Sequence, residues 1–199
     1  MNIAVFCSGN GSNFQAIADS VKNGGIKANI ALMVCDNPQA FALKRAEKLG
    51  IRNLLVEGKN FKSKDEFEGE IIKNLEKENI ELICLAGYMR IVSPSLVQRY
   101  SNKILNIHPA LLPSFKGTQG IKDALDYGVK LSGVTVHFVN DKMDQGPIIL
   151  QEALEIKDDD TEKSLAERIH QIEHKLYPQA VRLFVEGRLG IEGRKVKIR

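Results

Sequence analysis

The chain has 199 residues, which suits one hydrophobic core better than two catalytic domains joined by a linker, so we expect a single domain over residues 1–199. A hydrophobic content of 43% excludes a disordered polar chain. No apolar run approaches the length of a bilayer span. A net charge of +3 is too small to indicate a nucleic-acid surface. The opening Met1–Phe6 lacks the basic leader of a signal peptide. We therefore expect a soluble cytoplasmic protein, monomer or homodimer, that acts on small molecules and binds neither nucleic acid nor membrane.

Apolar runs rich in β-branched residues recur along the first half of the chain, and a stretch with helical periodicity follows each of them. Apolar runs without polar alternation are typical of parallel strands that helices cover on both faces. The pattern predicts an α/β fold with a Rossmann-like, mostly parallel sheet. The runs are Ile3–Cys7, Ile30–Cys35, Leu54–Val56, Leu82–Ala86 and Ile104–Ile107.

Beyond about residue 130 the pattern changes. Val134–Val139 and Ile148–Ile156 are two apolar runs joined by a short loop with Asp and Gly, which predicts an antiparallel hairpin. Thr161–Glu186 then predicts a long helix, bent or interrupted at Pro178. The basic tail beyond Arg194 is interpreted as a frayed, solvated terminus. Helix starts are expected at Ser12 and Ser93-Pro94, and helix ends at Gly50 and Gly187.

A glycine-rich turn, Ser8–Asn13, separates the first strand from the first helix. Such a turn brings unhindered backbone N–H groups to an anion at a helix N-terminus, so phosphate binding and a purely structural tight turn are both open interpretations. A nicotinamide cofactor is less favoured, because Phe14 replaces the third glycine of its fingerprint and Asp36 is the only acidic candidate for a ribose contact. No lysine of a Walker motif follows.

Two polar residues lie at the end of the last predicted parallel strand. Asn106 and His108 are two residues apart, so the alternation of the strand points both to one side, and Pro109 stiffens the loop that follows. Ligands of such sheets bind at the carboxyl ends of the strands. Asp144, in the hairpin loop, could fold over the same edge, where a carboxylate would raise the pKa of the imidazole. The alternative is that Asn106 and His108 only satisfy backbone groups at a strand end.

One competing motif concerns metal chemistry. Residues 170–174 match the H-x-x-E-H pattern of zinc proteases, with His170 and His174 on one helical face. A catalytic zinc needs a third protein ligand, and short helical matches arise by chance, so we expect no metal. The three cysteines lack metal-ligand spacing and are interpreted as buried, reduced thiols: Cys7, Cys35 and Cys84.

Four segments together resemble the formyltetrahydrofolate-dependent formyltransferase family, in particular the phosphoribosylglycinamide formyltransferases of de novo purine synthesis. They occur in the expected order and span most of the chain. One loop, residues 115–120, departs from the family because it lacks the histidines often found there. The matching segments are Ser8–Asn13, Ala86–Pro94, Leu105–Pro113 and Gly133–Pro147.

The resemblance implies a transfer of the formyl group of 10-formyltetrahydrofolate, a cosubstrate, to the amine of glycinamide ribonucleotide. It implies direct attack through a tetrahedral intermediate, without metal, by the catalytic set Asn106, His108 and Asp144. The ribonucleotide positions that it implies are Gly11, Ser12, Asn13, His170 and Glu173, and the folate positions are Lys64, Met89, Arg90, Ile91, Val92 and Asn106.

Two rival functions remain. A hydrolase would use a similar site to release formate from the formyl-folate, with water in place of the ribonucleotide amine. A non-catalytic nucleotide-binding module would need the glycine-rich turn but not the convergence of Asn106, His108 and Asp144.

Overall fold

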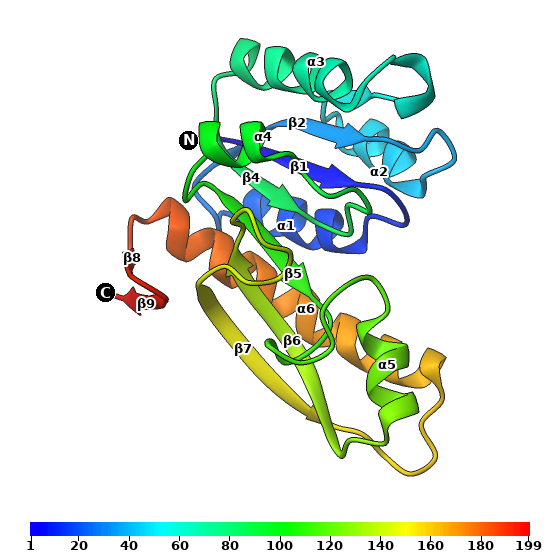
Figure 1. Cartoon of the computed structure of the whole chain (residues 1–199). Coiled ribbons are helices and arrows are strands. Elements are labelled where there is room, and N and C mark those ends of the chain that lie inside the picture. The colour runs from blue at the N-terminus through cyan, green and yellow to red at the C-terminus, as the bar shows by residue number, and fades with distance from the viewer.

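A computed structural model describes all residues, 1–199, and its strands form one sheet in the order β3-β2-β1-β4-β5-β6-β7-β9-β8 (Figure 1). The first five strands in this order run parallel, as the sequence predicts. Their bounds are β1 Asn2–Cys7, β2 Asn29–Cys35, β3 Asn53–Leu55, β4 Ile80–Leu85 and β5 Ile104–His108, within two residues of the predicted runs.

Helices cover both faces of this sheet because alternate strand residues face opposite ways. In β1, Ile3 and Val5 pack in a core with α1 and α6, whereas Ala4 and Phe6 pack in a second core with α3 and α4. The helices are α1 Ser12–Lys22, α2 Phe41–Leu49, η1 Gly58–Asn60, α3 Lys64–Lys77, α4 Pro94–Arg99, α5 Gly120–Tyr127 and α6 Glu162–Val185.

The sheet changes direction after β5. Strand β6, Leu131–Phe138, pairs antiparallel with β5 and with β7, Ile148–Glu155, so the predicted hairpin is confirmed. The register places Asn106 opposite His137 and His108 opposite Thr135. This reversal brings polar residues of β6 to the edge where the parallel strands end.

Helix boundaries follow the predicted signals. Ser93 caps α4 with its side chain, Pro94 is the first residue of that helix, and Gly50 follows α2 at φ 67°. Helix α6 starts after a capping box at Thr161 and runs unbroken through Pro178, so the predicted interruption there is wrong. The helix stays continuous because it is packed in the core on both sides of Pro178, where Tyr177 and Val181 are wholly buried.

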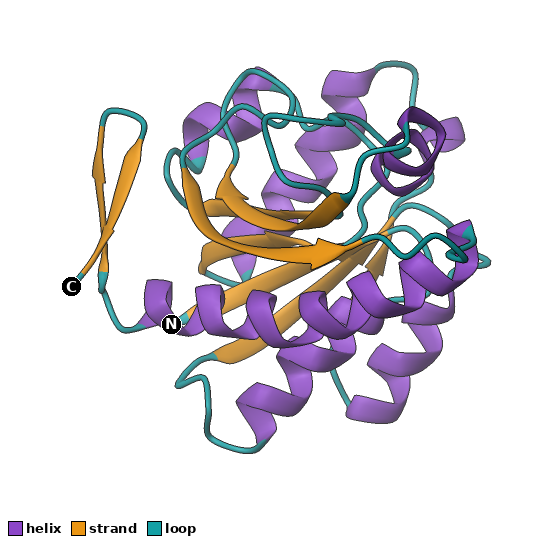
Figure 2. Cartoon of the chain, turned by 90° about the horizontal axis from the view of Figure 1, so that it is seen from below, coloured by secondary structure: helices purple, strands orange, loops and turns teal.

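The carboxyl terminus also differs from the prediction. Instead of fraying, it forms the hairpin of β8, Leu189–Glu192, and β9, Lys195–Ile198, at the margin of the molecule (Figure 2). Ile191 and Val196 pack against the main core, which gives the basic tail an apolar attachment that its charge concealed. Arg194 donates a hydrogen bond to the carbonyl of Gln145.

No helix is both long enough and apolar enough to cross a membrane. All three cysteines are free and buried, as predicted, and burial raises the pKa of each thiol.

Candidate active site

The polar cluster at the end of β5 contains Asn106 and His108, and the β6–β7 loop adds Asp144 to it. The Nδ1 atom of His108 lies 3.7 Å from Oδ2 of Asp144. A fourth residue, His137 of β6, lies between Asn106 and Asp144, with its Nε2 atom 3.2 Å from the Asn106 amide nitrogen and 3.6 Å from Oδ1 of Asp144. The structure therefore brings together the three residues that the strand-end argument predicts.

His108 is buried, and both of its ring nitrogens face oxygen atoms. Nε2 lies 2.8 Å from the carbonyl oxygen of Phe115, while Nδ1 faces Asp144. Burial lowers the pKa of His108 below its usual value, although Asp144 and the Phe115 carbonyl act in the opposite direction. The carboxylate alone predicts a raised pKa for His108; that prediction is wrong because desolvation of the ring outweighs the neighbouring charge.

Asp144 is held from two sides. Its Oδ2 atom accepts a hydrogen bond of 2.9 Å from the backbone N–H of Gly117, and its backbone has a φ of 53°, a left-handed conformation that is strained for this residue. Burial alone would raise the pKa of Asp144, but the neighbouring His137 and His108 rings and the hydrogen bond from Gly117 outweigh it and lower the pKa. The carboxylate is therefore ionised at neutral pH.

His137 fixes the orientation of Asn106. The Nδ1 atom of His137 lies 2.8 Å from the carbonyl oxygen of Phe138, which can only accept, so Nδ1 carries a proton. In the neutral ring Nε2 then accepts an N–H of the Asn106 amide, and the second N–H of that amide remains available. The sequence alone does not indicate a role for His137, because only the β5–β6 register shows which β6 residue faces Asn106.

The glycine-rich turn ends at an uncapped helix. Gly11 is the N-cap of α1 at φ 74°, no side chain caps the helix, and its first turn has no acidic residue. Free N–H groups at such a start favour an anion. The turn packs tightly on α2, since a Cβ atom on Gly11 would lie 2.7 Å from the Cβ atom of Ala42.

A second polar cluster joins this turn to α6. Glu173 is buried, and its Oε2 atom accepts hydrogen bonds from the Asn13 amide at 2.9 Å and from Nδ1 of His170 at 2.8 Å. His170 stacks on His174, one turn further along α6. No group of three or more His, Cys, Asp or Glu side chains lies close enough together to hold a metal ion, so the H-x-x-E-H match has no third ligand.

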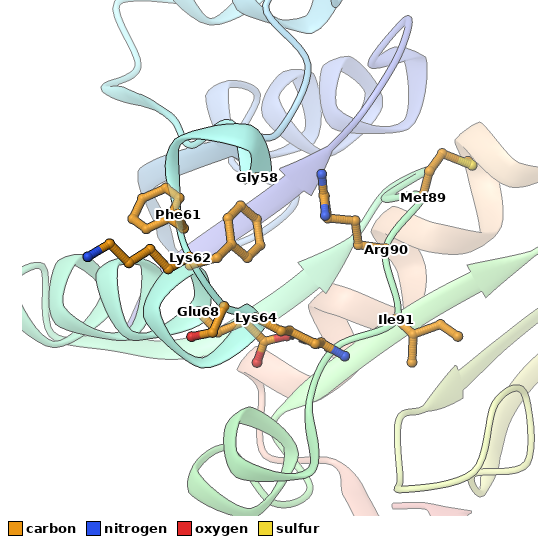
Figure 3. Close-up of a pocket in the computed structure, with 10 residues that line it drawn as sticks. Gly58, Phe61, Lys62, Lys64, Glu68, Met89, Arg90 and Ile91 are labelled. Carbon is orange, nitrogen blue, oxygen red and sulfur yellow. Dashed lines mark ion pairs between the residues drawn. The ribbon is translucent and has the colours of Figure 1, made fainter.

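Four of the six predicted folate residues, all but Val92 and Asn106, line a cavity of about 580 Å³ between α3 and the segment after β4 (Figure 3). Lys64, Met89, Arg90 and Ile91 line it, and Met89 and Ile91 expose most of their side chains. Val92 differs, because its side chain is buried in the core with α3 and α4. Any contact of Val92 with a ligand would therefore come from its backbone.

These sites lie on adjacent strands. The glycine-rich turn follows β1, the cavity segment follows β4 and the Asn106–His108 pair ends β5, and these strands are neighbours in the order β1-β4-β5. The first two are also joined directly, since Ser8 donates its backbone N–H to the Gly87 carbonyl and accepts from the Met89 N–H with its hydroxyl. One edge of the sheet thus carries an uncapped helix start, a polar cluster and a cavity.

The chain is similar to known formyl transferases over most of its length. The formyl transferase family model matches residues 1–181. The chain is 48% identical to phosphoribosylglycinamide formyltransferase of Bacillus subtilis over 90% of its length and 92% of that protein. It is 39% identical to the Escherichia coli enzyme of that name over 95% of its length and 89% of that protein. The crystal structure of glycinamide ribonucleotide transformylase 1 from Symbiobacterium toebii matches with a TM-score of 0.97 at 43% identity, covering 100% of this chain and 93% of that chain.

The fold and the family match are thus those of a formyl transferase, an enzyme that transfers one-carbon groups. Within that class, the chain belongs to the phosphoribosylglycinamide formyltransferase family.

Proposed function

We propose that the protein transfers the formyl group of 10-formyltetrahydrofolate to the amine of glycinamide ribonucleotide in purine biosynthesis. The observation that carries this proposal is the position of the Asn106–His108–Asp144 cluster at the end of β5. Two strands away the uncapped start of α1 offers a phosphate site, and on the strand between them the segment after β4 borders a cavity. A phosphorylated acceptor and a folate donor can therefore meet at the cluster.

The cluster supplies what direct acyl transfer to an amine requires, namely a donor to the developing oxyanion and a path for a proton. The available N–H of Asn106 and a protonated His108 stabilise the oxyanion of the tetrahedral intermediate. Asp144 holds the imidazolium and assists the proton in leaving the attacking amine. No covalent enzyme intermediate is formed, because the three cysteines are buried and the amine itself is the nucleophile.

The ribonucleotide binds at the turn and at α6. Its phosphate accepts hydrogen bonds from the backbone N–H groups of Gly11, Ser12 and Asn13, which explains the uncapped helix start. Glu173 and His170 contact the ribose; the Glu173 carboxylate is already oriented by Asn13.

The folate binds against Lys64, Asn106 and the segment Met89–Val92. The backbone of this segment contacts the pterin, Asn106 faces the formyl group, and Lys64 supplies positive charge. The folate is a cosubstrate that is consumed, and the reaction uses no metal.

A single assay separates this function from its rivals. With 10-formyltetrahydrofolate and glycinamide ribonucleotide together, we expect formylated ribonucleotide and tetrahydrofolate in equal amounts. Without the ribonucleotide we expect no release of formate. Formate release in its absence would instead indicate a hydrolase, and binding without turnover a nucleotide-binding module.

A further inference from the structure

Arg90 is held on three sides at the wall of the cavity. Its Nε atom lies 2.7 Å from Oδ2 of Asp36, and its guanidinium lies 4.8 Å from the ring centroid of Phe67. On the third side, a Cβ atom added to Gly58 would lie 2.6 Å from the Nη2 atom. The Arg90 side chain is nevertheless 45% exposed, so a ligand in the cavity can reach it (Figure 3).

Asp36 follows β2 and is largely buried, with 11% of its side chain exposed. Arg90 is its only hydrogen-bond partner, since its Oδ1 atom is buried without one. Of the two carboxylate oxygens, only Oδ2 therefore has a positively charged partner. The field of the Asp36 carboxylate extends to Tyr88, whose phenol pKa is raised first by burial and next by Asp36.

The cations around the cavity are compensated unequally. Lys64 lies 3.9 Å from Glu68, which is itself occupied by two hydrogen bonds from the backbone N–H of Ser93. Lys62 has no carboxylate within ion-pair distance. The Arg90–Asp36 ion pair is shorter than the Lys64–Glu68 pair. Among these cations, the availability of Arg90 to a ligand therefore depends most on its carboxylate partner.

We propose that Asp36 is a specificity-determining residue that weakens the binding of the acidic tail of the folate by competing for Arg90. The inference rests on the proposed function, because it takes the ligand of the cavity to be a folate that ends in glutamate carboxylates. A carboxylate of this tail that approaches Arg90 meets a guanidinium already paired with Asp36, and it also meets the repulsion of the Asp36 charge. The enzyme thereby limits how strongly added γ-glutamates increase affinity.

Asp36→Asn tests the proposal, because an asparagine can still accept from Nε of Arg90 but carries no charge. Steady-state kinetics are measured for wild type and variant with three donors: the folate with one glutamate, the folate with several γ-glutamates, and the pteroate form without glutamate. We expect the variant to lower KM for the monoglutamate about three- to tenfold, as for one partly screened unit charge. The decrease should be larger for the polyglutamate and absent for the pteroate form, with kcat and KM for the ribonucleotide unchanged.

Ionic strength provides a readout that a structural role would not change. The difference in KM between wild type and Asp36→Asn should shrink as salt is added, because the glutamate tail and the half-exposed Arg90 guanidinium are screened by ions. Glu47→Gln on α2 is the control, since it removes the same charge from an exposed residue without an ion pair. Asp36→Ser provides a second uncharged variant with a different shape.

An unchanged or raised KM for the polyglutamate in both Asp36 variants would overturn the proposal, as would an equal effect with the pteroate donor. These results leave the transfer activity of the wild type in place. Failure of the proposed function would differ, because wild-type protein would then form no formylated ribonucleotide with any donor.

Discussion

The Nε2 atom of His108 lies 2.8 Å from the carbonyl oxygen of Phe115, on the opposite side of the ring from Asp144. Phe115 and Asp144 both have left-handed backbones, at φ 50° and 53°, so strained residues supply both acceptors. Only a protonated ring carries the charge that pairs with Asp144, yet burial of His108 lowers its pKa. The site therefore balances desolvation, which favours neutral imidazole, against two oxygen atoms that favour imidazolium.

The first prediction concerns Asp144→Asn, which keeps the shape of the side chain and removes its charge. The pKa of His108 should fall further, because the carboxylate opposes the effect of burial. The single-turnover rate should fall by about 10²- to 10⁴-fold, the range typical of lost acid–base assistance, while ribonucleotide affinity changes little. Asp141→Asn, at an exposed position of the same loop, is the control. Near-normal chemistry with an unshifted NMR titration of His108 would contradict the assigned role.

The second prediction concerns the glycine-rich turn. Gly11→Ala should weaken ribonucleotide binding, measured by calorimetry, by about tenfold or more, because φ 74° is strained for alanine and its Cβ atom would meet Ala42 at 2.7 Å. Gly9→Ala is the matched control, since a Cβ atom there meets nothing within 4 Å. Equal affinities in the two variants would place the phosphate elsewhere.

The third prediction concerns the pH dependence of stability. The hydrogen bond from His170 to Glu173 raises the pKa of His170 above 6.5. A raised folded-state pKa contributes stability that is fully present below the unfolded pKa and is lost as pH rises through the folded pKa. We expect the difference in unfolding free energy between wild type and His170→Asn to shrink as the pH rises above about 6.5, the ordinary imidazole pKa, measured by urea denaturation. Because the His170 side chain is 48% exposed, the contribution of the pair to stability should be small. A difference in unfolding free energy that stays constant with pH would show that the His170–Glu173 pair contributes nothing.

The fourth prediction concerns metal. Formyl transfer should survive prolonged treatment with a chelator, because acyl transfer at the Asn106–His108–Asp144 cluster needs no Lewis acid. Elemental analysis of the purified protein should find zinc far below the one equivalent per chain that a catalytic zinc site would hold. Activity that is lost on chelation and restored by zinc would implicate His170 and His174 in metal binding.

The fold could be predicted from the sequence because buried parallel strands such as Ile3–Cys7 are continuous apolar runs, and helix ends carry local signals such as Ser93-Pro94. Two features depend on tertiary packing. The terminal hairpin depends on Ile191 and Val196 reaching the core, which its basic sequence does not indicate. Pro178 sits within an unbroken helix because packing on both sides outweighs the local penalty.

The candidate site could be predicted in part for the same reason. Asn106 and His108 share a strand, so their alternation alone places them together. The role of His137 depends on the antiparallel register, and the Phe115 contact depends on a loop backbone at positive φ, which a phenylalanine does not signal. The pKa of His108 depends on burial, which is a property of the assembled fold.

If the ribonucleotide phosphate binds at the uncapped start of α1, as proposed, the acceptor substrate contributes to the stability of the fold. The N-cap is Gly11, which offers no capping side chain and costs about a few tenths of a kcal/mol relative to Ser or Asp. A phosphate at this position would supply the missing interaction and bind only the folded chain, so the midpoint of thermal unfolding should rise with ligand concentration. In the absence of ligand, residues 9–13 would be the first at that edge of the sheet to exchange their amide hydrogens, and occupancy of the site would slow them.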